Sequence, residues 1–387
     1  MSSSTLKILK PTLLLVSTMT VMAGAIIAPA LPQIKEHFSH LPEAEFLTQL
    51  MLTVPGITIA LGAPLVGYLI DRFGRKKLLI ISLVLYGFTG TAGYSLDNLY
   101  HILISRALLG LAVAGIMTIT NTLTADYFEG KERNNFVSLR SSFVALGGVF
   151  FVGAAGFLAD IGWRVPFLVY FFSFLLLPLV VWVIYEPEVQ KSDPHRAGQQ
   201  VDYPRFWIRF VYFIAFLGMS LFYLIPVNVP FVLTEVIGVK NSVVGLSIAG
   251  SMLAAATSAG FYARLKNFLN FNALYALCFF LMSLGFLIVS QSSTYWFVLL
   301  GMICVGSGVG LIGPNHALCL MNSAPPELRG RILGSLSTFV FLGQFTSPFL
   351  GKFALSLNGS LSFSFALYGI IMLIIATGFT LGSLKKT

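Results

Sequence analysis

Long apolar stretches alternate with short polar segments along the whole chain of 387 residues. A helix needs about 20 mainly apolar residues to cross a bilayer, and each stretch is about that long or somewhat longer. Twelve stretches can be placed, six on either side of a polar segment at 186–206: 12–34, 46–70, 78–95, 101–124, 136–159 and 165–185, then 207–234, 241–262, 270–290, 296–321, 332–356 and 361–383. The pattern therefore predicts an all-α membrane protein with twelve transmembrane helices.

The composition supports this prediction and excludes several classes of protein. Apolar residues make up 56% of the chain and charged residues only 10%, whereas soluble proteins carry about 25% charged residues. The three cysteines, Cys278, Cys304 and Cys319, lie in apolar stretches and predict neither a disulfide framework nor a metal site. No catalytic pair, metal-ligand spacing or phosphate-binding loop is apparent. We therefore expect neither an enzyme nor a bound metal or cofactor.

The basic residues predict how the chain is oriented. If both termini lie on one side of the membrane, that side receives 19 of the 24 Lys and Arg residues. The other side receives only Lys35, Arg164, Lys240 and Lys352, and Arg106 falls within a span. Basic residues are enriched in cytoplasmic loops. We therefore expect both termini in the cytoplasm and interpret the net charge of +9 as a topology signal, not as a site for nucleic acid.

The two halves of the chain repeat each other. A shift of 196 residues aligns six identical residues within 15 positions: Arg133 with Arg329, Ser141 with Ser337, Phe143 with Phe339, Val144 with Val340, Leu146 with Leu342 and Gly147 with Gly343. Parallel repeats of this kind are typical of transporters that bind their substrate at the midplane between two halves. The repeat predicts a six-helix bundle at 1–185, a cytoplasmic linker at 186–206 and a second six-helix bundle at 207–387.

The loop between the second and third spans combines an acid with two glycines. Asp71 ends a predicted helix, with Gly67 four residues before it and Gly74 three residues after it. Gly67 permits close helix approach and Gly74 permits a tight turn. Asp71 is suited to face the positive N-terminus of another helix, and Arg75 offers a forked donor to a carboxylate. A basic loop that only sets topology would not require this aspartate and these glycines.

This loop resembles the signature of the major facilitator superfamily, G-x-L-x-D-R-x-G-R-[RK]. The matching residues are Gly67, Leu69, Asp71, Arg72, Gly74, Arg75 and Lys76. The span count, the linker and the repeat extend the resemblance over the whole chain. It implies a monomer in a bacterial inner membrane, in which Asp71 latches the two halves in the outward-facing state against the start of helix eleven, near Ile332. It also implies that Arg75 pairs with a carboxylate at the end of helix four, for which Asp126 is well placed.

A more specific resemblance is to the drug:proton antiporters of this superfamily. Arg106, with Gly110 four residues later, is similar to their R-x-x-x-G pattern on helix four, which is tied to proton coupling. Gly162-Trp163-Arg164 with Phe167 is similar to their G-W-R-x-x-F turn. A charge inside a span is costly and by default indicates function. The alternative is that Arg106 reaches the membrane surface or binds backbone carbonyls.

The polar residues within the spans suggest what the pathway binds. All 15 acidic residues fall in loops or at span ends. The candidates for the substrate or proton pathway are Arg106, Asn121, Asn228, Asn315, His316 and Gln344. A low-dielectric cavity with net positive charge favours an anionic or neutral substrate. His316 titrates near neutral pH and is a candidate proton carrier, unless it is a neutral histidine bonded within the bundle; Asp160 and Glu235 are alternatives.

Three hypotheses for the function remain. The first is secondary active transport by alternating access, namely proton-coupled efflux of small molecules or drugs. The second is transport, in either direction, of an anionic metabolite such as a carboxylate siderophore, and it rests on Arg106 in the absence of an embedded acid. The third is a transporter-like sensor that moves nothing. The latch residues argue against the third, because a static receptor has no use for a latch.

Overall fold

The computed structural model describes residues 3–187, 203–325 and 328–384, and these ranges consist of helices joined by short turns and loops, without a strand. The first half contains α1 (Ser3–Ala25), η1 (Ala28–Ala30), α2 (Leu31–His37), α3 (Ala44–Phe73), α4 (Arg75–Thr91), η2 (Ala92–Tyr94), α5 (Leu99–Tyr127), α6 (Gly130–Ile161), η3 (Val165–Phe171) and α7 (Phe172–Val183). The second half contains α8 (Arg205–Phe222), α9 (Leu224–Phe231), η5 (Val232–Val236), α10 (Asn241–Lys266), α11 (Phe271–Ser290), α12 (Tyr295–Ser323), α13 (Arg329–Asn358) and α14 (Leu361–Leu384).

Twelve segments of the described chain are long and apolar enough to cross a membrane. They begin and end within a few residues of the predicted stretches, so the predicted fold class is confirmed. Four of these spans contain more than one helical element, and the first and the seventh contain three each. The first breaks after Ala25, where Pro29 cannot donate to the carbonyl four residues earlier, and the seventh breaks after Phe222, four residues before Pro226.

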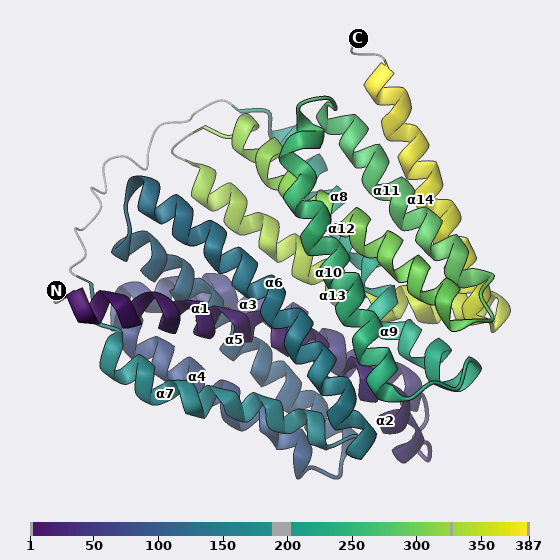
Figure 1. The fold of residues 1–387 in the computed structure, drawn as a ribbon, viewed down its shortest axis with the longest axis horizontal. Helices are drawn as coiled ribbons and strands as arrows, with labels where there is room; N and C mark the ends of the chain where they lie inside the picture. The colour runs from purple at the N-terminus through teal and green to yellow at the C-terminus, as the bar shows by residue number, and fades with distance from the viewer. Residues whose placement is uncertain (1–2, 188–202, 326–327, 385–387) are drawn as a thin grey trace.

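The molecule divides into two bundles that lie side by side (Figure 1). The first half, α1 to α7, is coloured purple to teal, and the second half, α8 to α14, is green to yellow. The halves meet mainly along two helix pairs, α6 with α10 and α3 with α13. We call the end of the bundle where α1 begins and α14 finishes the terminal end, and the opposite end, which carries α2 and η5, the far end.

Helices α3 and α13 touch near their middles and separate toward the terminal end. Gly56 and Gly67 lie eleven residues, or about three turns, apart on one face of α3. A Cβ atom at Gly56 would lie 2.7 Å from the backbone oxygen of Phe341 in α13, whereas a Cβ atom at Gly67 would meet nothing within 4 Å. Gly330 and Gly334, on the terminal side of Phe341, also face open space. On this side of the molecule, the gap between the two halves therefore widens toward the terminal end.

The other helix pair shows the same divergence. A Cβ atom at Gly156 in α6 would lie 2.9 Å from the Cα atom of Gly245 in α10, so the two backbones touch at the far end. Small residues allow such close packing between membrane helices. Gly260, nearer the terminal end of α10, has open space beside it. We call the boundary between the halves, along the α3–α13 and α6–α10 pairs, the seam. The seam is therefore closed at the far end and open at the terminal end, as the spread of the helices in Figure 1 shows.

Candidate transport pathway

Ionic and polar contacts connect the two halves at the far end. The ammonium of Lys35, in α2, lies 3.0 Å from a carboxylate oxygen of Glu235 in η5, and 2.9 Å from Glu45 in its own half. Deeper in the seam, the amide of Gln49 donates to the side-chain oxygen of Asn228 at 3.0 Å, and both residues are 2% exposed. Asn228, a predicted pathway residue, therefore helps close the far end in this arrangement.

Further contacts connect the halves on both sides of this seam. Lys352 in α13 lies 2.7 Å from Glu43, at the start of α3. The backbone N–H of Ser242, in the first turn of α10, donates to Asp160 at 3.2 Å, and the Asn241 amide donates to the Ala159 carbonyl at 3.3 Å. A carboxylate is favourable at the positive N-terminus of a helix. The end of α6 is thus bound to the start of α10.

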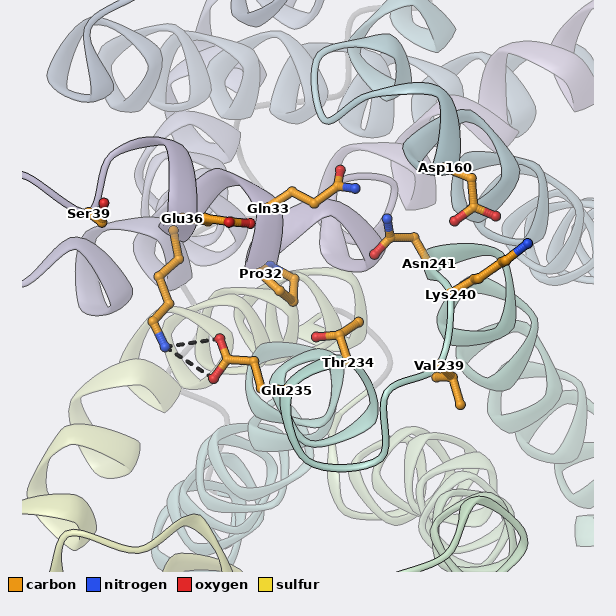
Figure 2. Close-up of a pocket in the computed structure, with 11 residues that line it drawn as sticks. Pro32, Gln33, Glu36, Ser39, Asp160, Thr234, Glu235, Val239, Lys240 and Asn241 are labelled. Atoms are coloured by element: carbon orange, nitrogen blue, oxygen red, sulfur yellow. Dashed lines mark hydrogen bonds and ion pairs between the residues drawn. The ribbon is translucent and has the colours of Figure 1, made fainter.

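A hollow of about 810 Å³ lies at the far end between the two halves. Figure 2 shows it with Glu36 and Gln33 on one side, Glu235 on another, and Asp160 opposite Lys240. The dashed lines mark the contacts between Glu235 and Lys35. Several of these side chains are exposed, so the hollow reaches the far surface.

Gln344 lies at the middle of the seam, where the halves still touch. It belongs to α13 and is buried. A Cβ atom at Gly24 in α1 would lie 3.3 Å from its amide nitrogen, and one at Gly56 in α3 would lie 3.5 Å from its side chain. The hydroxyl of Tyr223 donates to the Gly24 carbonyl at 3.5 Å. Gln344 thus contacts the opposite half where the closed and open parts of the seam meet.

Arg106 is completely enclosed within the first half. Its exposed fraction is 0%. The guanidinium donates to the Met51 carbonyl of α3 at 3.1 Å, to the Tyr170 hydroxyl of η3 at 2.8 Å and to the Ala23 carbonyl of α1. The contacts to Met51 and Ala23 are of the carbonyl-binding kind that the sequence left open as an alternative. Arg106 connects four elements of the first half here, and its part in the pathway stays a prediction.

Asn315 and His316 are enclosed within the second half. The oxygen of Asn315 accepts from the Tyr262 hydroxyl at 3.0 Å, and its amide donates to the Phe271 carbonyl at 3.2 Å. The Nδ1 atom of His316 lies 2.8 Å from the Tyr275 hydroxyl. Both residues of α12 thereby hold α10 and α11 in place. Their role in moving substrate or protons stays a prediction.

Asn121 pairs with an arginine that the sequence analysis did not include among the pathway residues. Asn121 is exposed, and its side-chain oxygen accepts from one guanidinium nitrogen of Arg140. Another guanidinium nitrogen of Arg140 donates to the Thr124 hydroxyl at 3.3 Å. The charge count assigned Arg140 to the cytoplasmic side. However, α6 begins at Gly130, so Arg140 lies nearly three turns into the helix. Because Arg140 falls inside the predicted stretch 136–159, the sequence did contain a signal that this arginine lies within a span.

The predicted latch loop is held by two carboxylates of the first half. The Nε atom of Arg75 lies 3.2 Å from Asp126, so the pairing that the family resemblance implies is present. The carboxylate of Glu186 accepts from the backbone N–H groups of Arg75 at 2.7 Å and of Lys76 at 2.9 Å. Gly74 has a φ angle of 84°, and a Cβ atom there would lie 2.9 Å from that carboxylate. Glu186 falls at the start of the predicted linker 186–206, and its contact with this loop was not predicted.

Of the other latch residues, the described side chain of Arg72 contacts Phe73 of its own half in this arrangement. The side chain of Asp71 lies outside the part that the structure describes. Gly67 faces open space, and Arg72 is exposed. Ile332, the expected docking position, is buried in its own half, where its carbonyl accepts from the Tyr212 hydroxyl at 2.8 Å. Most of the predicted linker, 188–202, also lies outside the described residues.

Comparisons with known proteins assign the family. The sequence model of the Major Facilitator Superfamily matches residues 13–348 and 210–385. The chain is 28% identical over 330 residues to multidrug resistance protein 1 of Bacillus subtilis, with 82% of each chain covered. It is 26% identical over 357 residues to the class C tetracycline resistance protein of Escherichia coli, with 86% of each covered.

The fold is similar to that of solved transporters. A bacterial homologue of the human lysosomal transporter Spinster, in an inward-facing and occupied conformation, superposes with a TM-score of 0.77 at 16% identity, covering 100% of this chain and 98% of that one. This likeness extends over both halves and the seam between them. The chain therefore belongs to the Major Facilitator Superfamily and is an integral membrane transporter, not an enzyme.

Proposed function

We propose that this chain is a proton-coupled exporter of small molecules that works by alternating access. One observation carries the proposal: charged and polar contacts connect the halves at the far end, while Gly67, Gly260 and Gly334 face open space toward the terminal end. A transporter with its site between two rocking repeats requires one closed and one open end. The relatives named for multidrug and tetracycline resistance support export as the direction.

The charge bias supports an orientation for this arrangement. With the basic terminal end in the cytoplasm of a bacterial cell, the described conformation is inward-facing in the inner membrane. The bundles 1–185 and 207–387 are then the two rocking bodies of a monomer, joined by the linker 186–206. In the outward-facing state, Gly67 would approach α13, and Asp71 would reach the start of that helix. Arg72, Gly74, Arg75, Lys76 and Asp126 would hold the loop in shape.

Arg140 favours a second candidate, the transport of an anionic or neutral amphiphile such as a carboxylate siderophore. In the described part of the spans, the charges that lie well away from the helix ends are cationic, Arg106 and Arg140, whereas the acids lie at helix ends. A cation in a low-dielectric cleft attracts anions strongly. Asn121 holds Arg140 at the open side of the first half. This candidate differs from the first in substrate, and it does not require a different mechanism.

Flux measurements in proteoliposomes test the proposal. We expect an imposed pH gradient to drive tetracycline, taken as a probe from the named relative, or an organic acid against its own gradient. The conservative Asp71→Asn variant should abolish flux without loss of folding, because it removes only the latch charge. The matched control is Asp97→Asn, an exposed carboxylate at the far end, which should keep wild-type flux.

Each outcome separates the candidates. Movement of tetracycline but not of the acid favours the drug exporter, and the reverse favours the anion transporter. Indifference to the pH gradient, with sodium or exchange driving flux instead, refutes proton coupling. Wild-type flux in Asp71→Asn refutes the latch. Specific binding of probes with no flux under any gradient would indicate the sensor.

A further inference from the structure

Three arginines line one hollow at the terminal end of the second half. The hollow has a volume of about 300 Å³ and lies between α8 and α13. Arg205 and Arg209 are four residues apart on α8 and therefore share one of its faces. Arg331 enters the hollow from the first turn of α13. Its described lining includes Ile332, near which the Asp71 latch is expected to dock, but none of the other candidate pathway or latch residues.

Within the part of the chain that the structure describes, no carboxylate neutralises the positive charge of this hollow. Among the described residues, none of the three guanidinium groups lies within ion-pair distance of a carboxylate. Arg205 instead lies over the ring of Tyr203, 5.3 Å from its centre. At the far end, by contrast, Lys35 and Lys352 are both paired. Like charges gathered in one hollow repel each other, and an anion would remove that cost.

The walls of the hollow are held firmly and offer further donors. The Tyr212 hydroxyl donates to the Ile332 carbonyl at 2.8 Å, and its ring stacks on Phe339 at 4.9 Å, so α8 and α13 are bound together here. Ser335 adds a hydroxyl. The start of α13 has no acidic residue in its first turn and no side-chain cap. The backbone N–H groups and the dipole at this helix start add to the positive potential.

We propose that this hollow binds a phosphate group, supplied by the headgroup of an anionic phospholipid. The guanidinium fork matches phosphate oxygens geometrically, which a lysine ammonium does not. The hollow lies where the seventh and eleventh spans begin, at Arg205 and Arg329, and the ends of spans are expected near lipid headgroups. Basic pockets between membrane helices on the cytoplasmic side bind such headgroups. This proposal rests on the proposed orientation only for the choice of the cytoplasmic leaflet. A soluble phosphate ester carries the same phosphate group and is the alternative ligand.

Binding measurements on the full-length protein test this site without reference to transport. The protein is purified in a neutral detergent, and its melting temperature and native mass spectrum are recorded with phosphatidylglycerol, with phosphatidylcholine and with inorganic phosphate. We expect phosphatidylglycerol to raise the melting temperature and to remain bound at one copy, and phosphatidylcholine to do neither. Equal protection by millimolar inorganic phosphate would identify a soluble phosphate as the source, and would still support the site.

Arginine variants test whether phosphatidylglycerol binds in this hollow. Arg209→Gln and Arg331→Gln should each weaken phosphatidylglycerol binding about tenfold, and Arg209→Lys should restore part of it because the charge returns without the fork. The matched control is Arg264→Gln, which removes an exposed arginine of α10 at the same end that does not line the hollow. Wild-type binding by both hollow variants, or an equal loss in Arg264→Gln, would overturn the proposal. The melting temperature without lipid shows whether each variant is folded.

Discussion

Lys35 of α2 lies 3.0 Å from Glu235 of η5, and this ion pair joins two residues 200 positions apart across the boundary between the halves. The same ammonium contacts Glu45 within the first half. The pair exists only while the far end is closed, because α2 and η5 belong to different bundles. In the proposed alternating-access cycle, it therefore contributes to the balance between the two end states.

Removing this pair should shift the molecule toward an arrangement that is open at the far end. We expect Glu235→Gln to destabilise the closed far end by about 0.2–1 kcal/mol, the usual value of a partly exposed ion pair, and so to shift the populations up to about fivefold. Spin labels at Ser39 and Val236, both exposed and on opposite halves, would measure the change in distance distribution. The matched control, Glu45→Gln, removes a contact that does not cross the seam. An equal shift in both variants would contradict this account.

Gly74→Ala should destabilise the protein less when Glu186 is also replaced by alanine. Gly74 has φ 84° and ψ 166°, a conformation essentially confined to glycine, so Gly74→Ala incurs about 1–3 kcal/mol. The substitution also displaces the Glu186 carboxylate. Glu186→Ala alone should cost about 0.5–2 kcal/mol, as the loss of a helix cap does. Thermal unfolding of the two single variants and the double variant would measure the coupling, which we expect at 0.5–3 kcal/mol. Strict additivity would mean that the carboxylate does not restrict residue 74.

Arg106→Ala should lower stability more strongly than it lowers substrate affinity. The substitution leaves two buried carbonyls and the Tyr170 hydroxyl without their donor, and each buried group left unpaired costs about 1–3 kcal/mol. Thermal unfolding would show this loss, with Tyr170→Phe as a smaller change at the same contact. If Arg106→Ala instead unfolds like wild type and weakens anionic substrates more than neutral ones, Arg106 acts as a counter-ion in the pathway.

Arg140→Gln should reduce the transport of anions without reducing that of neutral compounds. Arg140 lies well inside α6 and contacts Asn121, whereas Arg133, near the start of the same helix, is exposed. Flux of a matched anionic and neutral probe would be compared in Arg140→Gln and in the control Arg133→Gln. A parallel loss for both probes would assign Arg140 to packing, and an unchanged anion flux would remove it from the pathway.

The contacts that connect the two halves at the far end could not be predicted from the sequence. Lys35 and Glu235 have many possible partners of opposite charge, and nothing local in the sequence selects one. The pairing of Arg75 with Asp126 was expected only because the loop resembles a known signature. Glu186 was missed because its partners are backbone N–H groups, which every sequence has and which no residue type indicates. Arg140 was not included among the pathway residues because the charge count grouped it with the basic loop, although it falls inside the predicted stretch 136–159.

The sequence by itself determined the number and position of the membrane-spanning helices and the two-fold repeat. In hydrocarbon, every backbone group must be bonded within its own helix, so a span needs a long apolar run, and such runs are visible in a single chain. Only the tertiary structure decided which end is closed and which polar groups meet, because packing between helices brings together residues such as Gln49 and Asn228 that are far apart along the chain. The packing of the two halves therefore decides which end of the pathway is open.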